Sequence, residues 1–549
     1  MTRATPTPPK RTELKPRVVP PASVLGIALL LCALSLVPTL QGYATDAPPD
    51  RTFMGFPYMP RDHLQYAGFI RQAHDTGRLL LENPFTGEPQ RPSFLLLYFW
   101  ILGVFTRLTG ASVPLAWEIF RVAGGVLYVV VFWWMTGRFI ADSKRRVIAT
   151  GLFAFAGGLG WLATLARATL FPAAKALEYP YDYFWNWSTF GTMVMPNWVW
   201  PGLTFMAACL IRMRRGRFAD LLTFALLPTV WFLHAYSGMV AYLCFGLLPL
   251  APALRAVSRF ERIPWPRVRE NLRLAAPGLL SFGIVAAYLL WASTDQVFHL
   301  NSLQGFTWTA KFSIWWYPLG YGALLPLAWY GLRAASAERT GLPDDLLISW
   351  LLAAFVLSIN PWYAGVKFHY LIFPPLALLA ARGIFFARDG KGAAASALRS
   401  TPVMICLGLV LLLDAPVSLL KEKSQYAVDQ DLYNSAAQLD AMRWLDAQPD
   451  GLVLSDFVYG TRIPWLAGKK VYQGHWFMTV NLREKSNAVA GFFSPDAPSS
   501  FKTDLLRRSG ARYVFTGPED RAGPLDASLP LKRVYENGGI VIYEVTLPR

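Results

Sequence analysis

Residues 23–42 read SVLGIALLLCALSLVPTLQG and carry no charged side chain. A helix needs about 20 largely apolar residues to cross the hydrocarbon core of a bilayer, so this run is long enough to span it once. An apolar run near an N-terminus is also typical of a signal peptide, but this one lacks a clear small-x-small cleavage site and many further apolar runs follow it. We therefore predict an uncleaved first membrane helix at 23–42.

Ten further apolar runs follow this one along the chain, separated by polar connectors. They predict a polytopic α-helical membrane protein with about eleven transmembrane helices. The ten later spans are predicted near 114–137, 147–165, 197–213, 219–235, 238–255, 274–292, 315–332, 346–360, 366–386 and 401–420.

The formal net charge is +17 over 549 residues, which is also typical of nucleic-acid-binding proteins. Here, however, only 16% of the residues are charged, and the basic ones occur in short clusters between apolar runs. Clusters of this kind set the topology of membrane proteins, because basic connectors stay in the cytosol. We therefore predict that this protein has a lipid bilayer, and no nucleic acid, as its partner.

All of the basic clusters fall on one side of the membrane when eleven spans are counted. That side is predicted to be cytoplasmic, together with a disordered N-terminus over residues 1–22. The predicted location is the bacterial inner (plasma) membrane. The apolar segment 93–108 is left out of the count, since a span there would move every later cluster outward. It is predicted to be a juxtamembrane or re-entrant helix on the outer face.

The outer side of the membrane module, residues 23–420, carries two large loops at 41–113 and 166–197. From residue 421 the composition becomes that of a soluble domain, in which helix and strand patterns alternate. Residues 421–549 are therefore predicted to form a small extracytoplasmic, or periplasmic, α/β domain.

The soluble domain has clear local signals. Its predicted helices lie at 431–448 and 501–509, and its predicted strands at 452–456, 470–473 and 512–516. Two more strands, at 531–535 and 540–545, flank Asn537-Gly538-Gly539, a sequence typical of a β-hairpin turn.

The first outer loop contains PRDHLQYAGFIRQAHDTGRLLL at residues 60–81. Helical periodicity over 63–81 puts Arg61, Asp62 and His63 at the N-terminal end of a helix that also carries Tyr66. A carboxylate at this place is stabilised by the helix dipole. Asp62 therefore has two interpretations, an N-cap residue or a catalytic base, and Arg61, His63 and Tyr66 are candidate substrate-binding residues.

The second outer loop is crowded with aromatic residues. Glu178 and Asp182 lie four positions apart among several Tyr and Trp residues, including Trp185. Aromatic faces with a few carboxylates suit a sugar, because its C–H face stacks while its hydroxyls form hydrogen bonds. The same composition is also typical of an interfacial aromatic belt, and the sequence leaves both interpretations open.

Cations form a third group on the predicted outer side. Lys311 precedes an aromatic run, and Lys367 lies beside His369 and Tyr370 at the outer end of the tenth span. A lysine at an apolar boundary is costly unless it snorkels to the interface or meets an anion, and a lipid phosphate is a suitable anion. No metal ligand is assigned, because no cysteine pair has metal-ligand spacing.

The order of these features resembles the GT-C class of membrane glycosyltransferases, which includes protein mannosyltransferases and aminoarabinose transferases. A first span is followed by an outer loop with Arg-Asp near an amphipathic helix, and later by a span that carries Arg121. The other segments that carry the resemblance are RPSFLLLYFWILGVFTRLTG (91–110), KFHYLIFPPLALLAARGI (367–384), WLDAQPDGLVLSDF (444–457) and IPWLAGKKVYQGHW (463–476).

The resemblance implies transfer of a sugar from a polyprenyl-phosphate-linked donor to a lipid, glycan or protein acceptor at the outer face of the membrane. Asp62 matches the acidic residue of the first outer loop, which is the general base or a metal ligand in this class. Glu178 or Asp182 would be the second acidic residue. The cofactor stays open, with a divalent cation (Mg²⁺ or Mn²⁺) as the candidate.

The chain also departs from this class. The first outer loop has no Asp-x-Asp, and Arg91-Pro92 stands where some lipid A-modifying members have Lys-Pro-Pro or His-Pro-Pro. The acceptor is therefore left open. Lys311, Lys367 or Arg61 would stabilise the departing polyprenyl phosphate.

Two other function classes are consistent with a polytopic membrane protein. A membrane transporter or lipid flippase usually shows internal repeats, and none is visible across the predicted spans. A non-catalytic assembly protein for envelope polysaccharide would place its function in residues 421–549.

Overall fold

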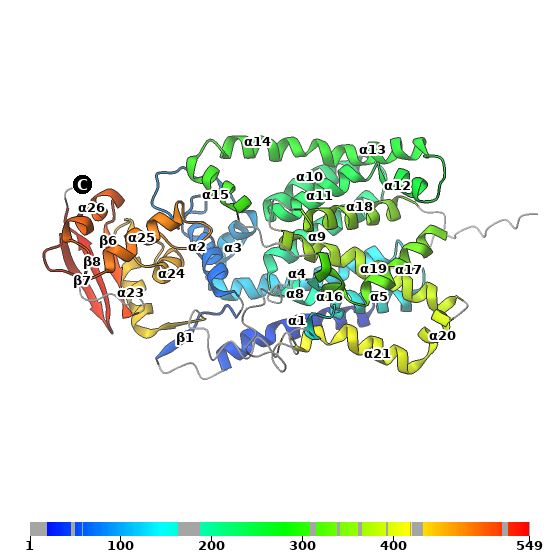
Figure 1. Cartoon of the computed structure of the whole chain (residues 1–549), viewed down its shortest axis with the longest axis horizontal. Helices are drawn as coiled ribbons and strands as arrows, with labels where there is room; N and C mark the ends of the chain where they lie inside the picture. The colour runs from blue at the N-terminus through cyan, green and yellow to red at the C-terminus, as the bar shows by residue number, and fades with distance from the viewer. Residues whose placement is uncertain are drawn as a thin grey trace, which may run out of the picture.

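The computed structural model describes most of this 549-residue chain, and it is mainly helical. The described residues are 19–44, 50–57, 59–162, 187–307, 314–337, 341–360, 365–390, 393–417, 419, 432–518 and 525–547. Figure 1 shows an elongated molecule with a helical bundle towards one end and a β-sheet at the other.

Four helical segments among the described residues are long and apolar enough to cross a membrane. They are α1 (Ala22–Ala44), α4 (Val113–Thr136), α13 with α14 (Trp265–Leu280 and Phe282–Ala292), and η3 with α19 (Gly365–Phe368 and His369–Asp389). A fifth is the pair α11 (Ala235–Leu247) and α12 (Ala251–Ser258), which is bent by 61°.

The remaining predicted spans also overlap helices, but these are shorter. They are α5 (Ser143–Phe155), α9 (Pro196–Arg212), α10 (Arg217–Leu233), α16 (Tyr317–Tyr321), α17 (Leu324–Ala337), α18 (Leu342–Ser358) and α21 (Thr401–Leu412). By length and apolarity four or five membrane crossings are therefore supported, and the count of eleven stays a prediction.

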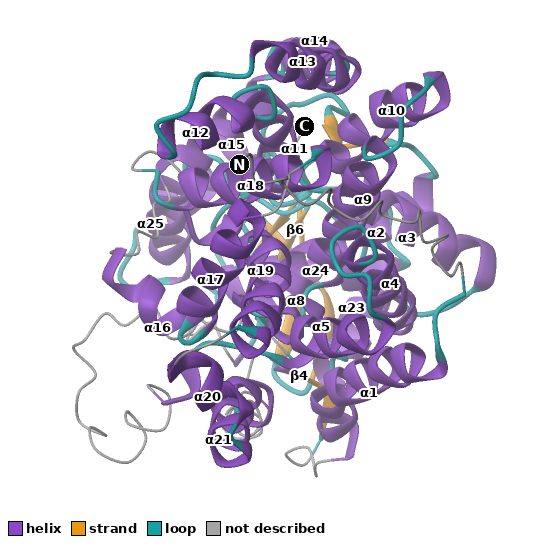
Figure 2. Cartoon of the chain, turned by 90° about the vertical axis from the view of Figure 1, so that its right-hand side faces the viewer, coloured by secondary structure: helices purple, strands orange, loops and turns teal. Residues whose placement is uncertain are grey.

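The helices run side by side in the bundle. In Figure 1, α13 and α14 lie along one long edge and α21 along the opposite edge, while Figure 2 looks along the bundle from its far end. Short helices join or cap the longer ones: α8 (Thr189–Met193), α15 (Gln296–Thr307), η2 (Ile314–Trp316) and α20 (Ala393–Arg399).

In Figure 1, α5, α12 and α13 lie towards the end of the bundle away from the sheet, and basic residues of these helices form ion pairs there. Arg145, at the start of α5, pairs with Asp389 at the end of α19, with 2.6 Å between Nη1 and Oδ2. Asp345, at the start of α18, pairs with Arg255 of α12 and with Arg267 of α13. Connectors far apart in sequence thus share one end, as the predicted common side of the basic clusters requires.

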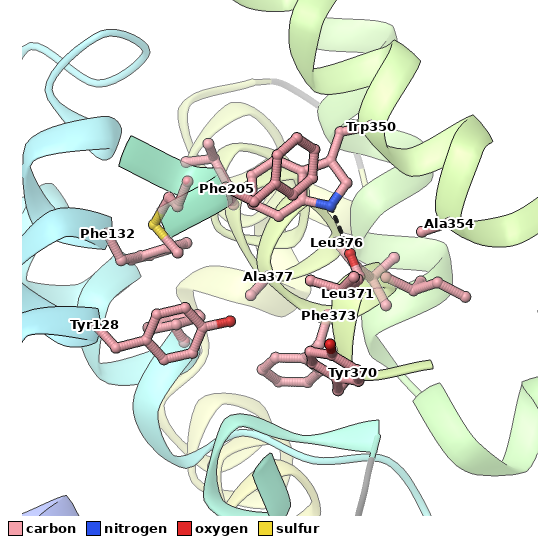
Figure 3. Close-up of a cluster of buried hydrophobic side chains, with 14 of the residues drawn as sticks. Tyr128, Phe132, Phe205, Trp350, Ala354, Tyr370, Leu371, Phe373, Leu376 and Ala377 are labelled. Carbon is pink, nitrogen blue, oxygen red and sulfur yellow. Dashed lines mark hydrogen bonds between the residues drawn. The ribbon is translucent and has the colours of Figure 1, made fainter. Parts of the chain in front are cut away.

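The core of the bundle is built around α19, most of which is buried. Pro375 lies inside this helix and has no N–H to donate to the carbonyl four residues earlier, that of Leu371. The indole N–H of Trp350, on α18, donates to that carbonyl instead, at 2.7 Å (Figure 3). Tyr128 and Phe205, on α4 and α9, lie in the same cluster.

Glycines allow α17 and α19 to approach closely. A Cβ added to Gly383 would lie 1.9 Å from the carbonyl oxygen of Leu327, and one added to Gly331 would lie 2.0 Å from that of Leu379. Small residues at such crossings let the helix backbones pack directly against each other. The contact therefore depends on the absence of a side chain at both positions.

We expect Gly383→Ala to lower the thermal unfolding midpoint of the detergent-purified protein. The added methyl group meets backbone atoms, which cannot move aside, and overpacking of this kind costs about 1–3 kcal/mol. Gly408→Ala on α21 is the matched control, because a Cβ there meets nothing within 4 Å. Equal midpoints for the two variants would contradict the proposed crossing.

The first outer loop forms α2 (Pro60–Thr76) and α3 (Leu97–Thr109), with a small hairpin of β2 (Leu80–Leu81) and β3 (Phe94–Leu95) between them. α3 has 13 residues, which give a helix about 20 Å long. This is shorter than the roughly 30 Å hydrocarbon core of a bilayer. α5, which overlaps a predicted span, also has only 13 residues, so the prediction that 93–108 does not cross the membrane stays a prediction.

Residues 432–547 hold a four-stranded sheet in the order β5-β6-β8-β7. β5 (Val453–Leu454) is parallel to β6 (Tyr513–Thr516), whereas β7 (Leu531–Asn537) and β8 (Ile540–Val545) form an antiparallel hairpin. Gly538 and Gly539 have φ of 55° and 80°, so the predicted hairpin turn is confirmed. The helices are α23 (Ala436–Asp446), α24 (Phe457–Leu466), α25 (Leu482–Phe493) and α26 (Ser499–Ser509).

This C-terminal region packs directly on the first outer loop. β4 (Tyr433–Ser435) pairs antiparallel with β1 (Arg51–Phe53), and α24 lies against α2. Ion pairs join Arg71 to Asp446 and Lys485 to Glu88, at 2.9 and 2.6 Å. The predicted boundary at 420/421 falls next to residues outside the described ranges, so it stays a prediction.

Candidate active site

The candidate site begins at the first turn of α2. This helix starts at Pro60, whose fixed φ suits the first helical position, and its N-cap is Met59, with a left-handed φ of 38°. Asp62 therefore lies inside the first turn, and the N-cap interpretation of this residue is wrong. The carboxylate still benefits from the positive end of the helix dipole.

The carboxylate of Asp62 meets a residue that is 413 positions away in sequence. Its Oδ1 lies 3.2 Å from Nε2 of His475, which belongs to the loop between α24 and α25. The side chain of Asp62 is 15% exposed and that of His475 is 2% exposed. The contact is thus nearly closed to solvent.

The electrostatic surroundings keep Asp62 ionised. Burial by itself raises the pKa of the Asp62 carboxyl group, whereas the hydrogen bond that His475 donates lowers it. Lys367 and His63 act in the same direction, so the pKa lies below the usual carboxyl value. The site therefore holds a negative charge throughout the neutral pH range.

Aromatic rings pack beside this carboxylate. The His63 ring stacks on Phe56 with 5.1 Å between centroids and meets Trp117 edge-on at 4.9 Å. The Tyr66 ring stacks on Phe99 at 4.8 Å. His63 is buried in this cluster, whereas Tyr66 is only partly buried. The His63 ring contacts Trp117 of α4, and the Tyr66 ring contacts Phe99 of α3.

Lys367 and Tyr370 meet at the N-terminus of α9. The Nζ of Lys367 lies 5.4 Å from the ring centroid of Trp198, on which the Tyr370 ring stacks at 5.3 Å. The Tyr370 hydroxyl is 3.1 Å from Nδ1 of His234 and also contacts Ser237. Asn197, next to Trp198, lies near the Tyr66 side chain, so the two groups of residues are neighbours.

The other predicted site residues are not part of this cluster or lie outside the described residues. His369 is buried, and its Nε2 lies 3.2 Å from the Tyr317 hydroxyl. Successive helical residues face different directions, which separates it from Tyr370. Arg61 is exposed on α2. Glu178, Asp182, Trp185 and Lys311 fall outside the described residues.

A divalent cation would need oxygen or nitrogen ligands around Asp62. Within the described part of the chain, no three His, Cys, Asp or Glu side chains lie close enough together to hold a metal ion. The Asp62 carboxylate instead faces a histidine and lies near a lysine. These residues do not fit a metal site, so no chemical step is derived through one.

Sequence reasoning missed three residues of the cluster: Asn197, Trp198 and His475. Asn197 and Trp198 follow Pro196, a helix-start signal at the end of the second outer loop. His475 stands in the aromatic run YQGHWF, and histidine occurs only six times in the chain. Neither signal indicates that these residues approach Asp62.

No family model and no curated protein matches the sequence. Solved structures do match. ArnT from Cupriavidus metallidurans in the apo state has a TM-score of 0.51 at 13% identity, covering 96% of this chain and 99% of that one. The archaeal oligosaccharyltransferase AglB from Archaeoglobus fulgidus, in complex with an inhibitory peptide and a dolichol-phosphate, has a TM-score of 0.51 at 14% identity, covering 90% and 69%.

The third similar structure is the arabinofuranosyltransferase AftD from Mycobacteria, with a TM-score of 0.51 at 17% identity, covering 97% of this chain and 40% of that one. All three neighbours are GT-C glycosyltransferases. The similarity extends over most of this chain, so the predicted resemblance is confirmed at the level of the fold. The chain has the fold of the GT-C membrane glycosyltransferases.

Proposed function

We propose that this protein is a glycosyltransferase that moves a sugar from a polyprenyl-phosphate donor to a hydroxyl group of a lipid, glycan or protein acceptor. The observation that carries the proposal is the buried, ionised carboxylate of Asp62, close to the cation of Lys367 and flanked by aromatic rings. ArnT has also been solved with undecaprenyl phosphate, and AglB with a dolichol-phosphate.

In the proposed reaction, an acceptor oxygen attacks the anomeric carbon of the sugar as the bond from that carbon to the phosphate oxygen breaks. The hydroxyl proton passes to Asp62, and the polyprenyl phosphate leaves with the electrons of the broken bond. A hydroxyl group is a weak nucleophile until a base takes its proton. Because its pKa is low, Asp62 accepts this proton late, once the new bond has made the hydroxyl acidic.

Lys367 is the proposed partner of the departing phosphate. Its charge offsets the negative charge that grows on the phosphate oxygen as the bond breaks. The Trp198 ring, over which the Lys367 ammonium group lies, stabilises this cation, because an aromatic face attracts an ammonium group. The second carboxylate, Glu178 or Asp182, remains part of the proposal, as do the contacts of Trp185 and Lys311 with the substrates.

The proposed orientation follows from the basic end of the bundle. Basic connectors stay in the cytosol, so the N-terminus would be cytoplasmic and Asp62 would face the extracytoplasmic side. The proposed membrane is the bacterial inner membrane. A lipid-borne donor reaches such a site by lateral diffusion, with its prenyl chain between the helices of the bundle.

A transfer assay tests the proposal. Purified protein is given a panel of polyprenyl-phosphate sugars with candidate acceptors, with and without a chelator, and we expect release of polyprenyl phosphate together with a glycosylated acceptor. Movement of the intact donor across sealed vesicles, without cleavage of its sugar–phosphate bond, would contradict the proposal and favour a flippase. A loss of transfer in the presence of chelator would show that the reaction also requires a metal ion, one that the described residues alone do not bind.

A further inference from the structure

His475 has no role in the proposed reaction, yet its side chain is buried against the carboxylate that the reaction uses. Its Nδ1 accepts a hydrogen bond from the backbone N–H of Phe477, at 3.3 Å. In a neutral imidazole the nitrogen that accepts carries no proton, so the proton is on Nε2. Nε2–H therefore donates to Oδ1 of Asp62, over 3.2 Å.

The loop that carries His475 is held by hydrogen bonds on several sides. The hydroxyl of Thr479 accepts from the N–H of Gly474 at 2.9 Å and donates to the carbonyl of Phe85 at 3.0 Å. The carbonyl of Met478 accepts from the side-chain amide of Asn83 at 2.6 Å. These bonds tie the loop to the first outer loop, the one that carries Asp62.

A second element, α15, holds the same loop from another direction. The side-chain amide of Asn301 donates to the carbonyl of Met478 at 3.1 Å, and that of Gln304 donates to the carbonyl of Thr479 at 3.1 Å. Gly474, next to His475, allows a close fit, because a Cβ there would lie 2.6 Å from the carbonyl oxygen of Gly460. A group fixed by this many contacts keeps its geometry.

We propose that His475 is a positioning residue for Asp62. It holds Oδ1 through Nε2–H and so directs Oδ2 towards the acceptor hydroxyl, which makes residues 432–547 part of the catalytic unit. This inference rests on the proposed function, since it assigns His475 to the same reaction.

The kinetic test compares His475→Ala with His475→Gln. Loss of the Nε2–H donor lets the carboxylate turn, and misplacement of a reacting group by about 1 Å costs about a hundredfold in rate. We therefore expect His475→Ala to lower kcat about a hundredfold with little change in KM for the donor. The side-chain amide of Gln presents N–H near the position of Nε2, so His475→Gln should recover most of kcat.

The matched control is His74→Ala. His74 lies on α2 with Asp62, but its Nδ1 is 3.1 Å from the hydroxyl of Thr106, and it makes no contact with Asp62 among the described interactions. We expect wild-type kcat from this variant. An unchanged kcat in His475→Ala would overturn the inference, and so would an equal loss in His475→Ala and His475→Gln, because that result indicates a packing role only.

A second readout does not need activity. The titratable groups near Asp62 are His475, Lys367, His63 and Tyr66, and loss of His475 should raise the pKa of Asp62 and hence its reaction with a carbodiimide, which attacks protonated carboxyl groups. Trypsin separates Asp62, in the peptide 62–71, from Asp75, in the peptide 72–78. Each peptide contains one carboxyl side chain, so Asp75 serves as the internal reference.

We expect Asp62 labelling at pH 6 to rise in His475→Ala, relative to Asp75, and to stay at the wild-type level in His74→Ala. Equal labelling of Asp62 in wild type and His475→Ala would overturn the inference. If wild-type protein transferred no sugar from any donor, the proposed function would fail. The labelling would then still decide whether His475 holds Asp62, so the two failures are distinguishable.

Discussion

Asp62→Asn is expected to lower kcat for sugar transfer by about two to four orders of magnitude, the range that a positioned general base contributes. Asparagine keeps the size of the side chain, but its amide cannot accept the hydroxyl proton. The measurement is the rate of polyprenyl phosphate release by purified protein at saturating donor. Because the buried carboxylate has its pKa below the usual value, we also expect wild-type activity to show no Asp62 titration between pH 5 and neutrality.

The matched control for this variant is Asp75→Asn. Asp75 lies in the last turns of the same helix and is exposed, and its ion pair with Arg71 is at the surface, where such pairs contribute at most about 1 kcal/mol. Wild-type kcat is expected. If Asp62→Asn kept full activity with a normal thermal unfolding midpoint, the role assigned to Asp62 would be wrong.

Asp345→Ala is expected to give the largest loss of stability. The Asp345 side chain is fully buried at the basic end of the bundle, where its Oδ2 accepts from Nε of Arg267 at 2.9 Å and from the amide of Asn271 at 3.0 Å, and where Arg255 also contacts it. Its removal leaves two arginines without their carboxylate, and breaking a buried pair in this way costs about 3–5 kcal/mol. The measurement is the thermal unfolding midpoint of the protein in detergent.

Glu270→Ala provides the comparison for Asp345→Ala. Glu270 is on α13, as is Arg267, but its side chain is 42% exposed and its partner Arg215 is 72% exposed. An exposed pair of this kind contributes at most about 1 kcal/mol, so the midpoint should change little. Similar shifts in both variants would show that Asp345 does not join α12, α13 and α18 as the structure indicates.

Several features of this fold follow from local sequence. The uncharged run at 23–42 forms α1, and the Asn537-Gly538-Gly539 turn forms the hairpin of β7 and β8. Each depends on residues close together in the chain, either on the length of an apolar run or on the conformations that a turn requires. The same reasoning put Asp62 at the start of a helix, although α2 begins three residues earlier and ends five residues earlier than the periodicity over 63–81 indicated.

The surroundings of Asp62 follow from packing instead. His475, Trp198 and Lys367 come from the C-terminal region, α9 and η3, which are far from Asp62 and from one another in sequence. A histidine or tryptophan has the same local preferences whether it fills a core or faces a carboxylate. Its partner therefore depends on how α2, α9 and the C-terminal sheet pack, and periodicity carries no information on that.

The amino-acid sequence was sufficient for the membrane class, the helical runs and the C-terminal hairpin, because each of these depends on the composition or spacing of neighbouring residues. The resemblance to the GT-C class, and not spacing, selected Asp62 as the candidate base. The folded chain was needed to exclude Asp62 as an N-cap and to bring His475 within 3.2 Å of it, a contact between residues 413 positions apart. Such contacts arise when whole elements pack and bury their faces together, which is a property of the assembled chain and not of any short stretch of it.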